Sequence, residues 1–207
     1  MGLWGRIVKK VDFAVKRAQL SLLPLGEDKI VIDCGANVGD VAVRFAKRGA
    51  TVYAFEPNPA AFAILSERMK PFPRVHCIPK GVMAKDGTMR LYLHAEAASD
   101  PVKWSVGSSV ISAKKNVDAG SYVDVAMVDL ASFIRGLGKR IAVLKIDVEG
   151  AEYGILKSLI ETGVIDSADI VLVETHEHKI PEIAEEAAVV RAEVKKRGIN
   201  NVRFDWI

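Results

Sequence analysis

The architecture of this chain can be read outward from the stretch Val31-Ile32-Asp33-Cys34-Gly35-Ala36-Asn37-Val38-Gly39-Asp40. A β-rich run over residues 29–32 ends on an acid, a turn with two glycines follows, and apolar residues then recur at helical spacing over residues 41–46. Strand, tight glycine turn and helix form the unit with which α/β domains bind nucleotide-like ligands at the carboxyl end of the first strand. We therefore expect an α/β fold with its ligand site at this turn.

The spacing of the two glycines narrows the class of ligand. The turn closes at Gly39, one residue earlier than in the dinucleotide fingerprint G-x-G-x-x-G, and Asn37 stands where the middle glycine belongs. Asp33 directs a carboxylate at the turn, which would repel a pyrophosphate and suit an ammonium group. A turn with a purely structural purpose is the alternative.

Length and composition indicate a single domain. The chain has 207 residues, of which 50% are hydrophobic and 27% charged, as is usual for soluble globular proteins. Cys34 and Cys77 form no disulfide framework or zinc motif and suit a reducing compartment. No apolar run approaches the ~20 residues of a membrane span, and charges interrupt the first 24 residues, which argues against a secretory signal. We expect a cytoplasmic protein.

Residues 1–24 differ from the rest of the chain in charge. They hold five of the basic residues and one acidic residue, whereas residues 25–207 are close to neutral and show no basic footprint for nucleic acid. We interpret the segment as an amphipathic helix that packs on the domain formed by residues 25–207. A lid over a substrate pocket and a weak membrane-surface contact are the alternatives. Its apolar face comprises Leu3, Ile7, Val11, Ala14, Ala18 and Leu22.

A second candidate binding motif follows the strand predicted over residues 51–55. Glu56 stands at the tip of that strand, where a carboxylate can accept hydrogen bonds from both hydroxyls of a ribose. Helix capping is the structural alternative, because Asn58 and Pro59 suit a helix start. After a helix and a third strand over residues 75–78, the backbone of Lys80-Gly81-Val82 is placed to line an adenine.

The middle of the chain is less regular. Residues 89–94 and 122–128 read as two strands, which we expect to pair with each other beyond the third strand. Between them, residues 95–120 form a long connection, which we interpret as a substrate-facing loop.

The chemistry of the site is expected at the tips of the next two strands. Asp147 and Glu149 follow the fourth strand, over residues 141–146, at the topological switch point of the sheet. His176 follows the fifth strand, over residues 170–173, and can act as a general base. The alternatives are helix capping by Glu149 or Glu152 and a histidine that is merely hydrogen-bonded.

Taken together, these motifs resemble the FkbM family of methyltransferases, in the expected order from about Lys29 to His178. The resemblance implies a Rossmann-like, class I fold that binds S-adenosylmethionine and O-methylates a sugar or natural-product hydroxyl. The stretches that carry it are Val31-Ile32-Asp33-Cys34-Gly35-Ala36-Asn37-Val38-Gly39, Phe55-Glu56-Pro57-Asn58, Lys145-Ile146-Asp147-Val148-Glu149-Gly150-Ala151-Glu152 and Val173-Glu174-Thr175-His176.

The resemblance also implies a set of cofactor-binding residues, with Asp147 near the transferred methyl group. The methionine part would lie at Asp33, Gly35, Asn37 and Gly39, the ribose at Glu56 and Pro57, and the adenine at Gly81 and Val82.

The predicted fold is a mostly parallel central sheet with helices on both faces. A class I sheet normally closes with a hairpin, whereas after the helix that ends at Gly198 only one strand, over residues 202–206, is evident. The far edge of the sheet is therefore short or completed by a partner, and an exposed edge would favour a homodimer.

The predicted function is S-adenosylmethionine-dependent O-methylation of a small-molecule or saccharide acceptor, with no nucleic-acid partner. His176 or Asp147 would take the hydroxyl proton, and Glu149 and Glu174 would orient the acceptor. No metal is predicted, although these four side chains together could bind Mg²⁺. A nicotinamide-dependent oxidoreductase and a non-catalytic nucleoside-binding module are the alternatives.

Overall fold

The computed structural model describes residues 23, 25–94, 96, 117–177, 179–204 and 206. The predicted N-terminal helix lies outside this part of the chain, and so does most of the predicted substrate-facing loop. Leu23 is buried, and its carbonyl accepts a hydrogen bond from Arg48 (Nη2 to O, 2.6 Å).

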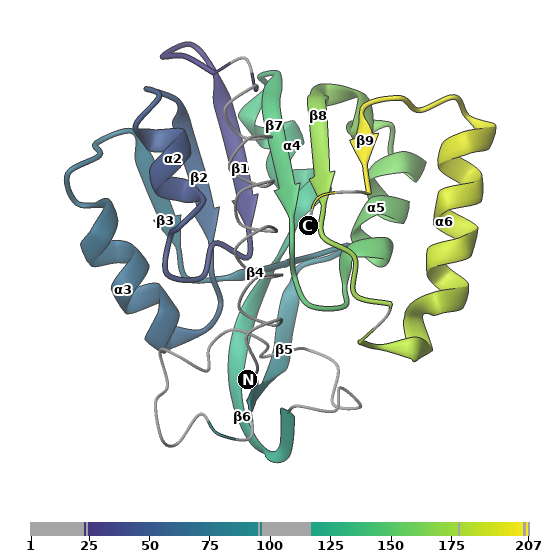
Figure 1. Ribbon diagram of the computed structural model, residues 1–207, viewed down its shortest axis with the longest axis horizontal. Coiled ribbons are helices and arrows are strands. Elements are labelled where there is room, and N and C mark those ends of the chain that lie inside the picture. Colours follow the sequence, from purple (N-terminus) through teal and green to yellow (C-terminus); the bar gives the residue numbers. More distant parts are fainter. Residues whose placement is uncertain are drawn as a thin grey trace, which may run out of the picture.

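The core of the molecule is a six-stranded parallel sheet in the order β3-β2-β1-β7-β8-β9 (Figure 1). Every residue of β1 and β7 is buried, as expected for central strands covered on both faces. Cys34 pairs with Ile146 and Ile146 with Val173, so β1, β7 and β8 end side by side. The strands are β1 Ile30–Cys34, β2 Thr51–Phe55, β3 Val75–Ile78, β7 Ile141–Ile146, β8 Ala168–Val173 and β9 Val202–Arg203.

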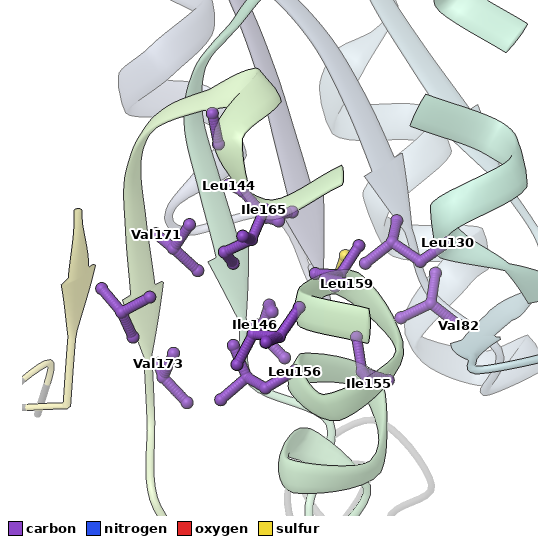
Figure 2. Close-up of a cluster of buried hydrophobic side chains, with 14 of the residues drawn as sticks. Val82, Leu130, Leu144, Ile146, Ile155, Leu156, Leu159, Ile165, Val171 and Val173 are labelled. Carbon is purple, nitrogen blue, oxygen red and sulfur yellow. The ribbon is translucent and has the colours of Figure 1, made fainter. Parts of the chain in front are cut away.

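Helices cover both faces of this sheet, which confirms the predicted Rossmann-like α/β fold (Figure 1). On one face α2 and α3 bury Phe45 and Leu65 against β1 and β2. On the other face α4, α5 and α6 pack over β7 and β8, and Figure 2 shows Leu156 and Leu159 of α5 in this second core. The helices are α2 Ala42–Ala46, α3 Pro59–Met69, α4 Leu130–Leu137, α5 Glu152–Glu161 and α6 Ala184–Lys196, with short 3-10 turns η2 Val164–Ser167 and η3 Pro181–Ile183. None of the helices in the described part of the chain has the length and apolar character that a membrane crossing needs.

A second, three-stranded sheet lies below the carboxyl ends of the parallel strands (Figure 1). It consists of β4 Gly81–Met83, β5 Gly87–His94 and β6 Val117–Asp129 in the order β4-β6-β5. The predicted antiparallel pairing of residues 89–94 with residues 122–128 is confirmed.

The predicted position of this pair, beyond β3 in the central sheet, is wrong. Burial alternates along residues 121–127 of β6, so the strand buries one face, whereas a strand of the central sheet is covered on both faces. Val125 and Met127 on this face pack with Leu91 of β5. Residues 117–120, expected in a loop, already belong to β6.

The far edge of the central sheet is short. Within the described residues the only strand beyond β8 is the two-residue β9, which pairs with β8 in parallel. The prediction of one strand at this position is confirmed, and β9 is shorter than the strand predicted over residues 202–206. A homodimer built on this edge stays a prediction.

Gly35 is the residue that lets β1 and β7 end so close together. Its φ is +80°, in the left-handed region, and a Cβ at this position would overlap the backbone oxygen of Asp147. Glycine is therefore required at position 35 both for the turn and for the close packing of the two strand ends.

We expect the substitution Gly35→Ala to destabilise the fold by at least ~3 kcal/mol, because the overlap is with backbone and the φ is strained. Gly136→Ala is the matched control: nothing lies within 4 Å of its new Cβ, and alanine in helix α4 should stabilise by roughly 0.5–1 kcal/mol. Urea unfolding of both variants measures the difference. Equal midpoints would contradict this account of Gly35.

Candidate active site

A cavity of about 350 Å³ opens at the switch point between β1 and β7. The glycine turn forms one wall, the tips of β2 and β7 form two others, and Leu91 and Met127 of the second sheet contribute an apolar side. The predicted site residues that line it are Gly35, Asn37, Glu56, Pro57, Gly81, Val82, Asp147 and Glu149.

Three of the predicted site residues do not line this cavity. Asp33 and His176 are fully buried behind its wall. Gly39, with φ +88°, lies against α3, where a Cβ would come within 2.9 Å of Leu65 Cδ1. Asp33 and Gly39 therefore contribute to the site through the residues in front of them.

Glu56 joins the glycine turn to the tip of β2. Its Oε2 accepts a hydrogen bond from the N–H of Asn37 and its Oε1 one from the N–H of Asn58, both at 2.8 Å. Asn37 has a φ of +49°, a conformation that asparagine tolerates better than most residues. Burial raises the pKa of Glu56 to about 7, and the two backbone hydrogen bonds oppose the rise.

The predicted helix start at this motif is also present. Asn58 is the N-cap of α3, its side chain accepts from the N–H groups of Ala60 and Ala61, and Pro59 is the first helical residue. The capping and binding interpretations therefore apply to different residues, since the carboxylate of Glu56 lines the cavity while Asn58 caps the helix.

Lys145 carries a buried ammonium at the centre of the site. Its Nζ lies 3.1 Å from Asp33 Oδ1 and 3.2 Å from Asp147 Oδ2, and it donates a hydrogen bond to the carbonyl of Gly35 at 3.1 Å. Burial alone would lower the pKa of Lys145, but the carboxylates of Asp147 and Asp33 raise it well above its usual value. The sequence suggested that Asp33 faces the ammonium group of a ligand, whereas in the structure it faces the ammonium group of Lys145.

His176 and Glu152 form a buried pair behind the tip of β7. The distance from His176 Nδ1 to Glu152 Oε1 is 2.8 Å, and Glu152 also accepts hydrogen bonds from the N–H groups of Val148 and Gly150. Burial opposes protonation of His176, yet the carboxylate of Glu152 raises its pKa above the ordinary value. Glu152 is the first residue of α5, which has no side-chain cap hydrogen bond, so its carboxylate holds the loop before the helix and His176 rather than capping the helix.

Sequence reasoning missed the importance of Lys145 and Glu152. The signal for Lys145 was present, because a lysine inside an otherwise apolar, fully buried strand needs a charged partner. Nothing local marked Glu152, since its partner His176 comes from another strand tip.

The site as a whole suits a ligand that carries positive charge. Carboxylates of Glu56, Asp147, Glu149 and Glu174 line it, with the cations of Lys145 and Lys179 beside them. Fold and site together define a Rossmann-like α/β protein with its cavity at the switch point.

The chain belongs to the family described as the methyltransferase FkbM domain, whose family model matches residues 33–199. It is 30% identical to hexuronic acid methyltransferase AglP of Haloferax volcanii over 151 residues, which cover 72% of this chain and 57% of AglP. It is 28% identical to 2-O-methyltransferase NoeI of Sinorhizobium fredii over 159 residues, which cover 72% of this chain and 64% of NoeI. The chain thus spans roughly three fifths of these curated relatives.

Among solved structures, the methyltransferase FkbM from Methylobacillus flagellatus matches with a TM-score of 0.45 and 15% identity, over 70% of this chain and 32% of that one. Similarity at this level indicates nothing about function.

We expect Lys145→Met to destabilise the fold by about 3–5 kcal/mol, because it leaves the buried carboxylate of Asp33 without its counter-ion. Adding Asp33→Asn removes that charge and should recover about 1–3 kcal/mol. Lys157→Met, on the exposed side of α5, is the control and should stay within about 0.5 kcal/mol of the parent. Urea unfolding measures all four proteins, and a double variant less stable than Lys145→Met would contradict the pairing.

The raised pKa of Glu56 predicts a pH dependence of stability. The folded protein keeps this proton up to a pH of about 7, whereas the unfolded chain loses it at about 4.5. The protonated carboxyl group of Glu56 therefore contributes its full stabilisation of the folded state below about pH 4.5, and this contribution is lost as the pH rises to about 7. Relative to Glu56→Gln, the parent should lose roughly 3 kcal/mol across that window. Urea unfolding at pH 4.5, 6 and 7.5 tests this, and parallel curves for the two proteins would refute it.

Proposed function

We propose that this chain is an S-adenosylmethionine-dependent O-methyltransferase whose acceptor is a saccharide or a related hydroxylated small molecule. The observation that carries the proposal is the cavity at the switch point, with the buried carboxylate of Glu56 on one side and Asp147 and Glu149 on the other. Membership of the FkbM methyltransferase family supports it.

The residues that line the cavity support binding of both ends of the cofactor. Each oxygen of Glu56 accepts one backbone hydrogen bond and has capacity for a ribose hydroxyl as well. Gly81 and Val82 line the cavity beside Met127, and their backbone and the side chain of Val82 would contact the adenine. The methionine part would lie along Gly35 and Asn37, where the surrounding carboxylates favour a cationic ligand. When bound, the cofactor supplies the methyl group as a sulfonium electrophile.

The structure favours particular side chains for handling the acceptor's proton. Asp147 and Glu149 line the cavity and can reach a hydroxyl there, whereas His176 is buried behind them. We assign proton removal to the cavity-lining carboxylates, orientation of the acceptor to Glu149 and Glu174, and a positioning function to His176.

The acceptor class is proposed from the relatives. AglP is named a hexuronic acid methyltransferase and NoeI a 2-O-methyltransferase, so both names are consistent with a carbohydrate hydroxyl as the acceptor. Because this chain spans only part of each relative, the acceptor of the whole protein stays a proposal.

Calorimetric titration with S-adenosylmethionine, S-adenosylhomocysteine and NADH tests the cofactor. We expect micromolar binding of the two S-adenosyl ligands and none of NADH. Glu56→Gln should weaken that binding at least tenfold, because an amide cannot accept all the hydrogen bonds that the carboxylate accepts. Glu67→Gln, on the exposed side of α3, is the matched control and should bind like the parent. Binding of NADH instead would favour an oxidoreductase, and binding of the S-adenosyl ligands without methylation of any saccharide would favour a non-catalytic module.

A further inference from the structure

Three potential metal ligands from two strand tips gather at one side of the cavity. Asp147 follows Ile146 at the end of β7 and Glu174 follows Val173 at the end of β8, and the register pairs Ile146 with Val173. The parallel pairing therefore brings the two carboxylates side by side. One atom each of Asp147, Glu174 and His176 lies within 4.8 Å of the other two.

The buried imidazole of His176 points its second nitrogen into this group. Nε2 is buried and has no hydrogen-bond partner among the described residues. It lies 3.9 Å from Asp147 Oδ1, 3.9 Å from Glu174 Oε1 and 3.3 Å from Glu149 Oε2. A buried nitrogen surrounded by carboxylate oxygens needs a positive charge, which is either a proton on the ring or a cation among these atoms.

The contact on the other side of the ring stabilises a protonated imidazole and equally orients a neutral imidazole toward a cation. Nδ1 lies 2.8 Å from Glu152 Oε1, and that carboxylate is held in place by backbone N–H groups. With its proton on Nδ1, His176 presents the lone pair of Nε2 to the three oxygens. A carboxylate that orients the far nitrogen of a histidine is the usual support of a metal-binding imidazole.

We propose that Asp147 Oδ1, Glu174 Oε1 and His176 Nε2, with Glu149 beside them, form a divalent-cation site. Two donors that share an ion at about 2.1 Å can be at most about 4.2 Å apart. His176 Nε2 meets this limit with Asp147 Oδ1 and with Glu174 Oε1, each at 3.9 Å, and all three residues offer ligand atoms within 4.8 Å of one another. Asp147 can pair with Lys145 and bind the ion at the same time, because Oδ2 faces the Lys145 ammonium and Oδ1 faces the imidazole of His176.

The donor set selects among cations. Carboxylate oxygens suit Mg²⁺, Ca²⁺ and Mn²⁺, and the imidazole nitrogen adds a preference for a transition metal, so Mn²⁺ is a suitable ion with which to probe the site. Asp147, Glu149 and Glu174 line the cavity while His176 is behind them, so an ion here would have protein on one side and open coordination positions toward the acceptor. This function rests on the proposed methyl transfer, in which a cation would lower the pKa of the acceptor hydroxyl; the binding of the ion does not.

Titration of the metal-free protein with Mn²⁺ tests the site, with free Mn²⁺ followed by its electron paramagnetic resonance signal. We expect one Mn²⁺ per chain, bound more tightly than Mg²⁺ or Ca²⁺ in competition. Glu174→Gln and His176→Ala should each weaken binding 10- to 100-fold. Glu177→Gln is the matched control in the same loop, because its carboxylate faces Tyr153 and Arg191, and it should bind Mn²⁺ like the parent.

Failure of the parent protein to bind Mn²⁺, or equal binding by the parent and folded Glu174→Gln, would overturn the site. Glu174 is the informative position if His176→Ala does not fold, because its side chain is partly exposed. Titration with S-adenosylmethionine in the presence of a chelator separates the two proposals. A protein that binds Mn²⁺ but does not bind S-adenosylmethionine would support the metal site and count against the proposed function. A protein that binds S-adenosylmethionine but does not bind Mn²⁺ would support the proposed function and overturn the metal site.

Discussion

The buried ammonium of Lys145 connects the two central strands at their functional end. It lies between Asp33 of β1 and Asp147 after β7, and it also holds the carbonyl of Gly35. Without it, two carboxylates would face each other across a strand pair that Gly35 allows to approach very closely. The position of the glycine turn and the orientation of Asp147 therefore depend on one side chain, which contributes both to stability and to the shape of the cavity.

Negative charge is concentrated at this edge of the sheet, and each carboxylate is balanced in its own way. Backbone N–H groups bind Glu56, the ammonium of Lys145 balances Asp33, and backbone N–H groups together with His176 hold Glu152. Glu149 and Glu174 face the cavity beside the same imidazole. An edge with this charge distribution is suited to cationic ligands, which is why a sulfonium cofactor and a divalent cation can be proposed for neighbouring parts of one pocket.

The second sheet gives the pocket its apolar side. Strands β5 and β6 have one apolar face, and burying it below the carboxyl ends of the central strands brings Leu91 and Met127 to the cavity. A strand pair with a single apolar face could not have extended a sheet that is covered on both sides by helices. The single apolar face that keeps these strands out of the central sheet thus also brings apolar side chains to the cavity.

The strands of the central sheet, the turn between Asp33 and Gly39, and the position of Glu56 could be predicted from the sequence, because each depends on local patterns of apolar residues, glycines and caps. The place of the second sheet and the partners of Lys145 and Glu152 could not, because they depend on contacts between residues far apart in the chain. The parallel register of β1, β7 and β8 brings those residues together, and burial then decides which charges must pair. Only the tertiary structure put His176 behind the cavity wall rather than in it, since the sequence shows which strand tip a residue follows but not the depth at which its side chain lies.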